Sequence, residues 1–247
     1  MRVVATYSIK GGVGKTSTAV NLAHEAAESG IRVLLWDLDP QGAATYFVRV
    51  KPVVKGGAAK LVGRKGSLAP HVRATDHPSL HLVPSDFSLR HLDVHLDHTK
   101  APRRRIESLL RGVEDHYDLA LLDCPPGISL SSEAVFGASD VLLVPTIPTT
   151  LSARTLDQLA TFLRDHGRSP EVLPFFSMVD RRKKLQRQLV ESLRSERPSF
   201  LRTEIPNASA VERMARERLP VAVVAPRSAA ARAFHDLWSE LAGHVWT

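Results

Sequence analysis

This chain of 247 residues contains only one cysteine, Cys124. One thiol cannot form an intramolecular disulfide, and it cannot supply the several thiolates of a metal cluster built from one chain. Long apolar runs are also missing, so no segment predicts a membrane span. No basic segment followed by a long apolar stretch precedes the first predicted strand, which argues against an export signal. These absences favour the cytoplasm as the compartment.

Acidic residues are fewer than basic ones, with 26 Asp and Glu against 33 Lys and Arg, a formal net charge of +7. This excess favours association with polyanions such as nucleic acid. Acidic residues are absent altogether from residues 49–73, which are basic and contain several glycines. Two interpretations of that segment stay open: a flexible excursion that contacts a polyanion, or a solvated surface connection.

Hydrophobic residues make up 43% of the chain and charged residues 24%, as is usual for a globular protein. The length fits one large α/β domain that spans residues 1–247. Apolar runs of strand length alternate with segments of helical spacing, which predicts a mostly parallel sheet covered by helices on both faces. Beyond residue 79, strands are expected at 80–84, 117–123, 140–145, 172–179 and 221–224, with a short strand and turn at 203–207, and helices at 102–116, 152–166, 184–194, 210–218 and 228–245.

A glycine-rich segment, residues 8–17, joins a β-branched run at residues 2–7 to a helical pattern at residues 17–29. A strand, a glycine-rich loop and a helix in this order are the context of a phosphate-binding loop. The match to G-x-x-x-x-G-K-[ST] is altered, because Ile9 stands where the first glycine belongs, and Lys10 is an additional lysine.

The residue types of this segment suit a nucleotide. Glycines let backbone N–H groups turn toward a phosphate, and the start of the helix adds a partial positive charge. Lys15 is predicted to reach the β- and γ-phosphates, and the Thr16 hydroxyl to ligate Mg²⁺. A plain tight turn is the alternative.

Carboxylates stand at the ends of two predicted strands. Asp37 and Asp39 follow the buried run 31–36 and lie on one face if the strand continues. The carboxyl ends of parallel strands are where α/β proteins bind ligands. Asp123 ends the run 117–123, where phosphate-loop enzymes place an acid of the Mg²⁺ shell. Alternatively, Asp39 only initiates a turn and Asp37 only caps a loop.

The turn 124–127, Cys-Pro-Pro-Gly, suits a loop that senses the γ-phosphate, and Cys124 is expected to be packed rather than nucleophilic. His91, His95 and His98 follow one another at helical spacing. Three imidazoles on one face could bind Zn²⁺, although a solvated helix face explains them as well.

Taken together, residues 10–16, 37–42 and 121–127 resemble the ParA/MinD family of deviant Walker ATPases, and most of all its ParA branch. The resemblance continues through residues 82–85, 144–146, 178–181 and 205–206, so it covers nearly the whole chain. It is weakest over residues 49–73.

The resemblance implies a single-domain P-loop NTPase fold, with ATP and Mg²⁺ as cofactors and a homodimer that sandwiches ATP between its subunits. Lys10 then corresponds to the signature lysine that reaches the phosphates of the partner subunit. Lys10, Lys15 and Asp39 would be catalytic, with Asp39 orienting the attacking water, and Thr16, Asp37 and Asp123 would support the metal. The nucleotide-binding set would be Lys10, Gly11, Gly12, Val13, Gly14, Lys15, Thr16, Ser17, Pro206 and Asn207.

The last two of these residues would contact adenine. The family commonly has Pro-x-Asn at this place, whereas this chain has Pro206-Asn207-Ala208.

For the ParA branch, the resemblance implies an ATP-dependent switch that binds DNA without sequence preference, associates with the nucleoid in the cytoplasm, and positions plasmid, chromosome or other cargo. A ParB-like or cargo-adaptor protein would stimulate hydrolysis. The candidate DNA-binding residues are Arg181, Arg182, Lys183, Lys184, Arg187, Arg213, Arg216 and Arg218.

The main alternative is a MinD-like ATPase that cycles on a membrane. It would use an apolar stripe of the last helix, which is more simply explained by docking on the protein's own sheet: Phe234, Leu237, Trp238, Leu241 and Val245. An iron–sulfur or other metal-dependent reductase of the same superfamily is disfavoured by the single cysteine.

Overall fold

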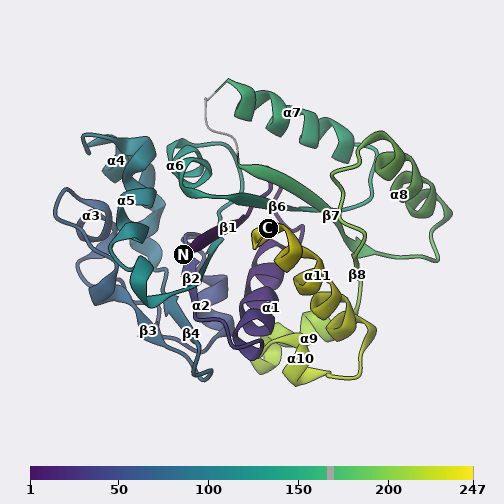
Figure 1. Cartoon of the computed structure of the whole chain (residues 1–247), viewed down its shortest axis with the longest axis horizontal. Helices are drawn as coiled ribbons and strands as arrows, with labels where there is room; N and C mark the ends of the chain where they lie inside the picture. The colour runs from purple at the N-terminus through teal and green to yellow at the C-terminus, as the bar shows by residue number, and fades with distance from the viewer. Residues whose placement is uncertain (166–169, 247) are drawn as a thin grey trace.

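A mostly parallel sheet forms the centre of the computed structural model, which describes residues 1–165 and 170–246 (Figure 1). Within these residues the sheet has eight strands in the order β3-β4-β2-β5-β1-β6-β7-β8. Their bounds are β1 Arg2–Thr6, β2 Val33–Asp37, β3 Arg73–Ala74, β4 Leu80–Val83, β5 Leu119–Asp123, β6 Val141–Thr146, β7 Glu171–Val179 and β8 Glu204–Pro206. Among the strands of the described residues, only the short edge strand β3 runs antiparallel to its neighbour.

Each central strand is buried on both faces, which explains its continuous apolar sequence. In β2, Leu34 and Trp36 belong to one hydrophobic cluster, whereas Val33 and Leu35 belong to the other. Side chains alternate in direction along a strand, so the two clusters lie on opposite faces of the sheet. The expected α/β fold with helices on both faces is confirmed.

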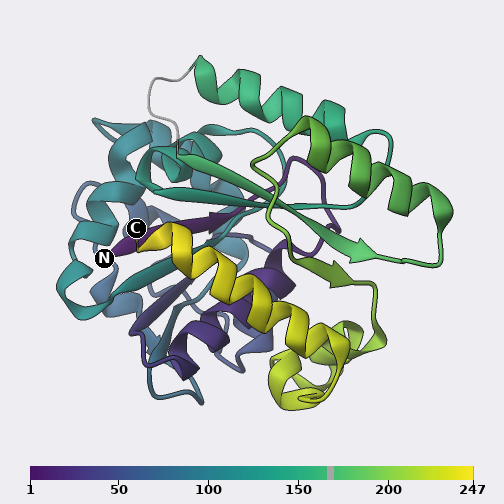
Figure 2. The same ribbon diagram turned by 45° about the vertical axis from the view of Figure 1, so that its right-hand side comes forward.

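One face is covered by helices α3 Gly57–Val62, α4 Leu92–Asp97, α5 Arg105–Arg111, α6 Leu130–Ala138, α7 Ser152–Arg164 and α8 Lys184–Glu196. The other is covered by α1 Lys15–Glu28, α2 Ala43–Phe47, α9 Ser209–Glu217, α10 Val221–Val224 and α11 Ala229–Val245. Figure 2 shows α11 crossing this second face beside α1. Short 3₁₀ turns at Ala69–His71, Phe87–His91, Pro102–Arg104 and Glu114–His116 complete the described elements.

The strand expected at residues 221–224 is wrong, because these residues form helix α10. Pro220 precedes the helix, and its carbonyl accepts hydrogen bonds from the N–H groups of Val223 and Val224. The Asn21 side chain accepts the N–H of Val221 at 2.8 Å. A β-branched run forms a strand only where a neighbouring strand supplies hydrogen-bond partners. Here the N–H groups of Val223 and Val224 find their partners in a helical turn instead.

Two other expectations need correction. Residues 102–116 do not form one helix: α5 is flanked by separate 3₁₀ turns. Residues 49–73 are neither an excursion nor a mere connection, since α3 places Leu61 and Val62 in the core. The Arg105 guanidinium donates to the carbonyl oxygens of Val62 and Gly66, at 2.7 and 3.0 Å, which holds the end of this segment. The helix expected at 152–166 is observed to Arg164, and its last predicted residue lies outside the described residues.

Candidate functional site

The loop between β1 and α1 has the backbone of an anion cradle. Gly12 and Gly14 have φ values of 70° and 92°, in the left-handed region that glycine adopts without strain. Gly14 precedes α1 and provides no side-chain cap, and the first turn of the helix carries no acidic residue. The N–H groups at the start of α1 therefore face the loop and have no side-chain partner at the N-cap. This arrangement is the one that an anion-binding helix start requires.

A cavity of about 530 Å³ opens in front of this loop. This volume lies within the range of small-molecule sites, roughly 300–1,000 Å³. Distant parts of the chain meet there, since the loop, the end of β2 and the segment after β8 all line it. The predicted site residues in its lining are Gly11, Gly12, Gly14, Lys15, Thr16, Ser17, Asp39, Pro206 and Asn207.

Lys15 is only 7% exposed and lies among carboxylates. Its Nζ donates to the Lys10 carbonyl oxygen at 3.4 Å. Burial lowers the pKa of Lys15, while the nearby Asp123 and Asp39 raise it. A lysine with so little hydration can form strong interactions with a phosphate, because the cost of removing water from its charge is already part of the fold.

Asp123 and Asp37 lie opposite each other in register at the ends of β5 and β2, and both are fully buried. Asp123 Oδ1 accepts a long hydrogen bond of 3.4 Å from Thr6, whereas Oδ2 has no partner. Burial raises the pKa of Asp123 well above its usual range, and Asp37 raises it further. The nearby Thr16 hydroxyl and the charge of Lys15 lower the pKa of Asp123. An unpartnered buried carboxylate oxygen near the Thr16 hydroxyl fits the oxygen-ligand chemistry of Mg²⁺.

Asp37 differs from Asp123, because both of its carboxylate oxygens already accept hydrogen bonds. Oδ2 accepts from the Thr45 N–H at 2.8 Å and from the Thr45 hydroxyl at 2.7 Å, and Oδ1 accepts the N–H of Asp39 at 3.2 Å. Burial raises the pKa of Asp37 to about 6, against the effect of these hydrogen bonds. Asp37 therefore fixes the loop that carries Asp39 and the start of α2.

Lys10 and Val13 stand apart from the large cavity. Lys10 is exposed, and with Val13 it lines a neighbouring pocket of about 80 Å³ between the loop and the segment after β6. Val13 itself is buried, and its carbonyl accepts the Ser177 hydroxyl at 2.5 Å. The lysine side chain thus lies outside the cavity that its own loop forms.

Sequence reasoning missed several residues of the site. Ser177 and Met178 line the cavity from β7, where Met178 has a φ of 55° and the pairing with β8 shifts register. Thr45 holds Asp37. The family resemblance included Met178 but assigned it no role, and nothing in the local pattern marks Ser177 or Thr45.

The basic candidates for DNA contact are in two groups, on either side of β8 (Figure 1). Near α8, Arg181 pairs with Glu204 at 3.1 Å and Arg182 with Asp180 at 2.9 Å. The exposed members of both groups are Arg181, Arg182, Lys183, Lys184, Arg187, Arg213 and Arg216. Salt bridges at exposed sites are weak, so these pairs leave the cations accessible to a polyanion.

Arg218 differs from the other candidates, because its side chain is turned back onto the protein. Its Nε donates to the Tyr46 carbonyl oxygen at 2.9 Å, and its guanidinium lies 4.4 Å from the centre of the Tyr46 ring. Arg218 thus ties the end of α9 to α2.

The three histidines predicted on one helix face do not gather. His91 precedes α4, His95 lies within it and His98 follows it, and the rings of His91 and His95 are 6.5 Å apart. Within the described residues, the one group with metal-ligand spacing is a different one: His24, Glu28 and His77.

The C-terminal helix is docked. Phe234, Leu237, Trp238, Leu241 and Val245 are all buried against the sheet face that α1 also covers. The docking interpretation of this apolar stripe is confirmed. Across residues 1–165 and 170–246, no helix combines the length and apolar character that a membrane span requires.

Comparison with known proteins shows the family to which the chain is similar. The family described as "AAA domain" matches residues 1–169. The sporulation initiation inhibitor protein Soj of Bacillus subtilis is 29% identical over 250 residues, covering 98% of this chain and 99% of Soj. The chromosome partitioning protein ParA of Caulobacter vibrioides is 30% identical over 204 residues, covering 79% of this chain and 76% of ParA.

Two solved structures have the same fold. Apo McdA of Cyanothece superposes with a TM-score of 0.85 at 21% identity, covering 98% of this chain and 99% of McdA. The cell division ATPase MinD of Pyrococcus furiosus superposes with a TM-score of 0.81 at 22% identity, covering 98% and 99%.

The fold and the loop define a P-loop ATPase. More particularly, the chain belongs to the ParA/MinD family of partitioning and positioning ATPases, so the predicted family is confirmed.

Proposed function

We propose that this protein is an ATP-dependent dimerising switch that binds Mg²⁺ and ATP in the 530 Å³ cavity and positions intracellular cargo on DNA. The observation that carries the proposal is the different placement of two lysines of one loop. Lys15 is buried beside Asp123, whereas Lys10 is exposed outside the cavity. A lysine held outside its own site is available to the site of a second copy.

In this proposal, Lys15 and the N–H groups at the start of α1 hold the phosphates. Thr16 and Asp123 would hold Mg²⁺, which when bound would supply positive charge that stabilises the phosphates. Asp39 lines the cavity and orients the water that attacks the γ-phosphate in line. Asp37 positions Asp39, because its Oδ1 accepts the Asp39 N–H. Pro206 at the end of β8 and Asn207 just after it line the cavity and would contact adenine.

In this proposal, dimerisation links the binding of ATP to the binding of DNA. Lys10 from the facing subunit adds positive charge at the γ-phosphate, so ATP stabilises the dimer and its hydrolysis releases it. The ATP-bound dimer binds DNA without sequence preference through the exposed cations near α8 and α9. A ParB-like or cargo-adaptor protein accelerates hydrolysis and resets the cycle. DNA is favoured over a membrane surface here, because the apolar stripe of α11 is buried.

Sedimentation with and without a slowly hydrolysed ATP analogue tests the coupling. The wild-type chain is expected to dimerise only with nucleotide, and Lys10→Ala is expected to bind nucleotide yet stay monomeric. Lys51→Ala, which removes another exposed lysine, is the matched control and should behave as wild type. A Lys10→Ala variant that dimerises with nucleotide as the wild type does would overturn the proposed role in trans.

A further inference from the structure

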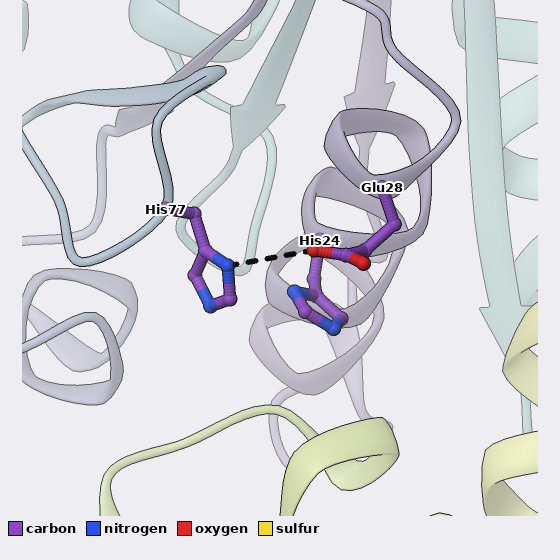
Figure 3. A group of neighbouring side chains, drawn as sticks. All are labelled: His24, Glu28 and His77. Atoms are coloured by element: carbon purple, nitrogen blue, oxygen red, sulfur yellow. Dashed lines mark ion pairs between the residues drawn. The ribbon is translucent and has the colours of Figure 1, made fainter.

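A second cluster of ligand-type side chains lies away from the nucleotide cavity, at the far part of α1. His24 and Glu28 project from successive turns of this helix, and His77 comes from the turn between β3 and β4 (Figure 3). One ligand atom from each of the three lies within 4.8 Å of the others. We propose that His24, Glu28 and His77 form a site for a divalent transition-metal ion of the Zn²⁺ type.

The helical spacing explains why two of the ligands meet. Residues four apart lie one above the other on a helix, so His24 and Glu28 face the same neighbour. His77 is held opposite them by its backbone, since its N–H donates to the Thr75 hydroxyl at 3.1 Å and its carbonyl accepts the N–H of Leu80 at 3.1 Å. The third ligand therefore comes from a turn whose backbone is fixed before any ion binds.

His24 supplies the observation that points to a ligand. It is only 5% exposed, yet its Nδ1 has no hydrogen-bond partner. A buried polar atom without a partner is rare in a folded protein and calls for an explanation. The ring is turned toward His77, and the two ring centres are 4.4 Å apart with planes at 67° (Figure 3).

Small movements complete the site. In a tetrahedral zinc site with bonds of about 2.0–2.1 Å, ligand atoms are about 3.3 Å apart. Here His77 Nδ1 and Glu28 Oε1 are separated by 3.8 Å. Glu28 is free to approach, because its side chain is 65% exposed, and His77 is 21% exposed. Two imidazoles and a carboxylate suit Zn²⁺, with water in the fourth position, whereas Mg²⁺ prefers oxygen ligands.

An ion bound here would cross-link α1 to the β3–β4 edge of the sheet. Without metal, the Glu28–His77 contact at 3.8 Å is partly exposed and contributes little to stability. With metal, opening of the β3–β4 turn requires the ion to dissociate, so binding should slow hydrogen exchange there and raise the melting temperature.

The test uses the full chain without an affinity tag and without nucleotide. Zn²⁺ binding is measured by calorimetry, and Co²⁺ by the visible absorption of a tetrahedral site. One ion per chain is expected, with affinity reduced at least about 10-fold in His77→Ala and in Glu28→Gln. Both substitutions change partly exposed side chains, and circular dichroism checks that the variants fold. His98→Ala is the matched control, since it removes an exposed histidine outside the cluster.

Tight binding that His98→Ala retains and His77→Ala loses would support the site. Equal affinity of the wild type and His77→Ala would overturn it, as would the absence of saturable binding at micromolar concentrations of Zn²⁺. Loss of binding in His98→Ala alone would also overturn it, because the ion would then belong to the histidines around α4.

Discussion

Asp37 and Asp123 end neighbouring strands in register, but only Asp37 has partners for both carboxylate oxygens. The two acids therefore have different physical roles although they occupy equivalent positions. Asp37 is a buried anchor for the Asp39 loop, and Asp123 keeps an oxygen available beside Thr16 and Lys15. This difference between the two acids leads to a separate prediction for each.

The first prediction concerns the Mg²⁺ dependence of hydrolysis. Asp123→Asn removes the charge beside Thr16, so we expect ATP hydrolysis to fall by about 100-fold or more and to need more Mg²⁺. Steady-state phosphate release, measured over a range of Mg²⁺ concentrations, checks this. Asp76→Asn, a change to an exposed acid, serves as control. Unchanged rates in Asp123→Asn would remove this acid from the site.

The second prediction concerns stability of the nucleotide-free protein. The pKa of Asp37 is raised from 3.8 to about 6 by burial, so the folded state binds this proton more tightly than the unfolded state. The resulting stability is fully present below about pH 4 and is lost as the pH rises through about 6. A shift of this size corresponds to roughly 3 kcal/mol.

Asp37→Asn should reduce this pH dependence, because it removes one of two neighbouring buried acids whose pKa values are raised. The difference in unfolding free energy, wild type minus variant, should therefore fall by roughly 2–3 kcal/mol as the pH rises from 4 to 7. Urea denaturation at several pH values measures it. Asp118 and Asp180 do not interfere, because their pKa values are lowered to about 2 by Arg32 and Arg182 and so change stability at lower pH. A difference that stays constant with pH would contradict the prediction.

Local pattern was sufficient for most of the architecture. The buried runs of β2 and β5 and the glycine-rich start of α1 were predictable, because strand burial and loop chemistry are local properties. Residues 221–224 were not predictable in this way. Their β-branched composition favours a strand, but Asn21, 200 residues away in the chain, accepts the first N–H of a helix. Likewise, Ser177 meets Val13 across 164 residues, and no local pattern encodes such a contact.

The third prediction tests the DNA surface. Arg182→Glu combined with Lys183→Glu should abolish binding to DNA in the presence of an ATP analogue, while nucleotide affinity is retained. The wild-type affinity should fall steeply with salt, because each phosphate contact releases counterions. The matched control is Lys51→Glu with Lys55→Glu, which reverses two exposed charges in the basic segment 49–73. Loss of DNA binding in the control pair alone would move the surface to that segment.

The fourth prediction separates Arg218 from its neighbours. Because Arg218 donates to Tyr46 and stacks on its ring, Arg218→Ala should lower the free energy of unfolding by about 1–2 kcal/mol. Its effect on DNA affinity should be small. Arg216→Ala should weaken DNA binding and leave the free energy of unfolding nearly unchanged. The reason is that this exposed side chain is paired only weakly with Glu217, at 3.7 Å. Denaturation and DNA titration of both variants measure the contrast, and a purely DNA-related effect of Arg218→Ala would contradict it.

The fifth prediction concerns the apolar stripe of α11. Leu237 is fully buried between α11 and the sheet, so Leu237→Ala should destabilise the protein by about 2–5 kcal/mol. If the stripe instead bound a membrane, the same change would leave stability unaltered and reduce flotation with anionic vesicles in the presence of ATP. Because the side chain already has apolar neighbours in the folded chain, wild-type protein is expected not to float. Ser239→Ala, on the solvent side of the same helix, controls for changes in helix propensity. Flotation of the wild type that Leu237→Ala abolishes at unchanged stability would favour the MinD-like alternative.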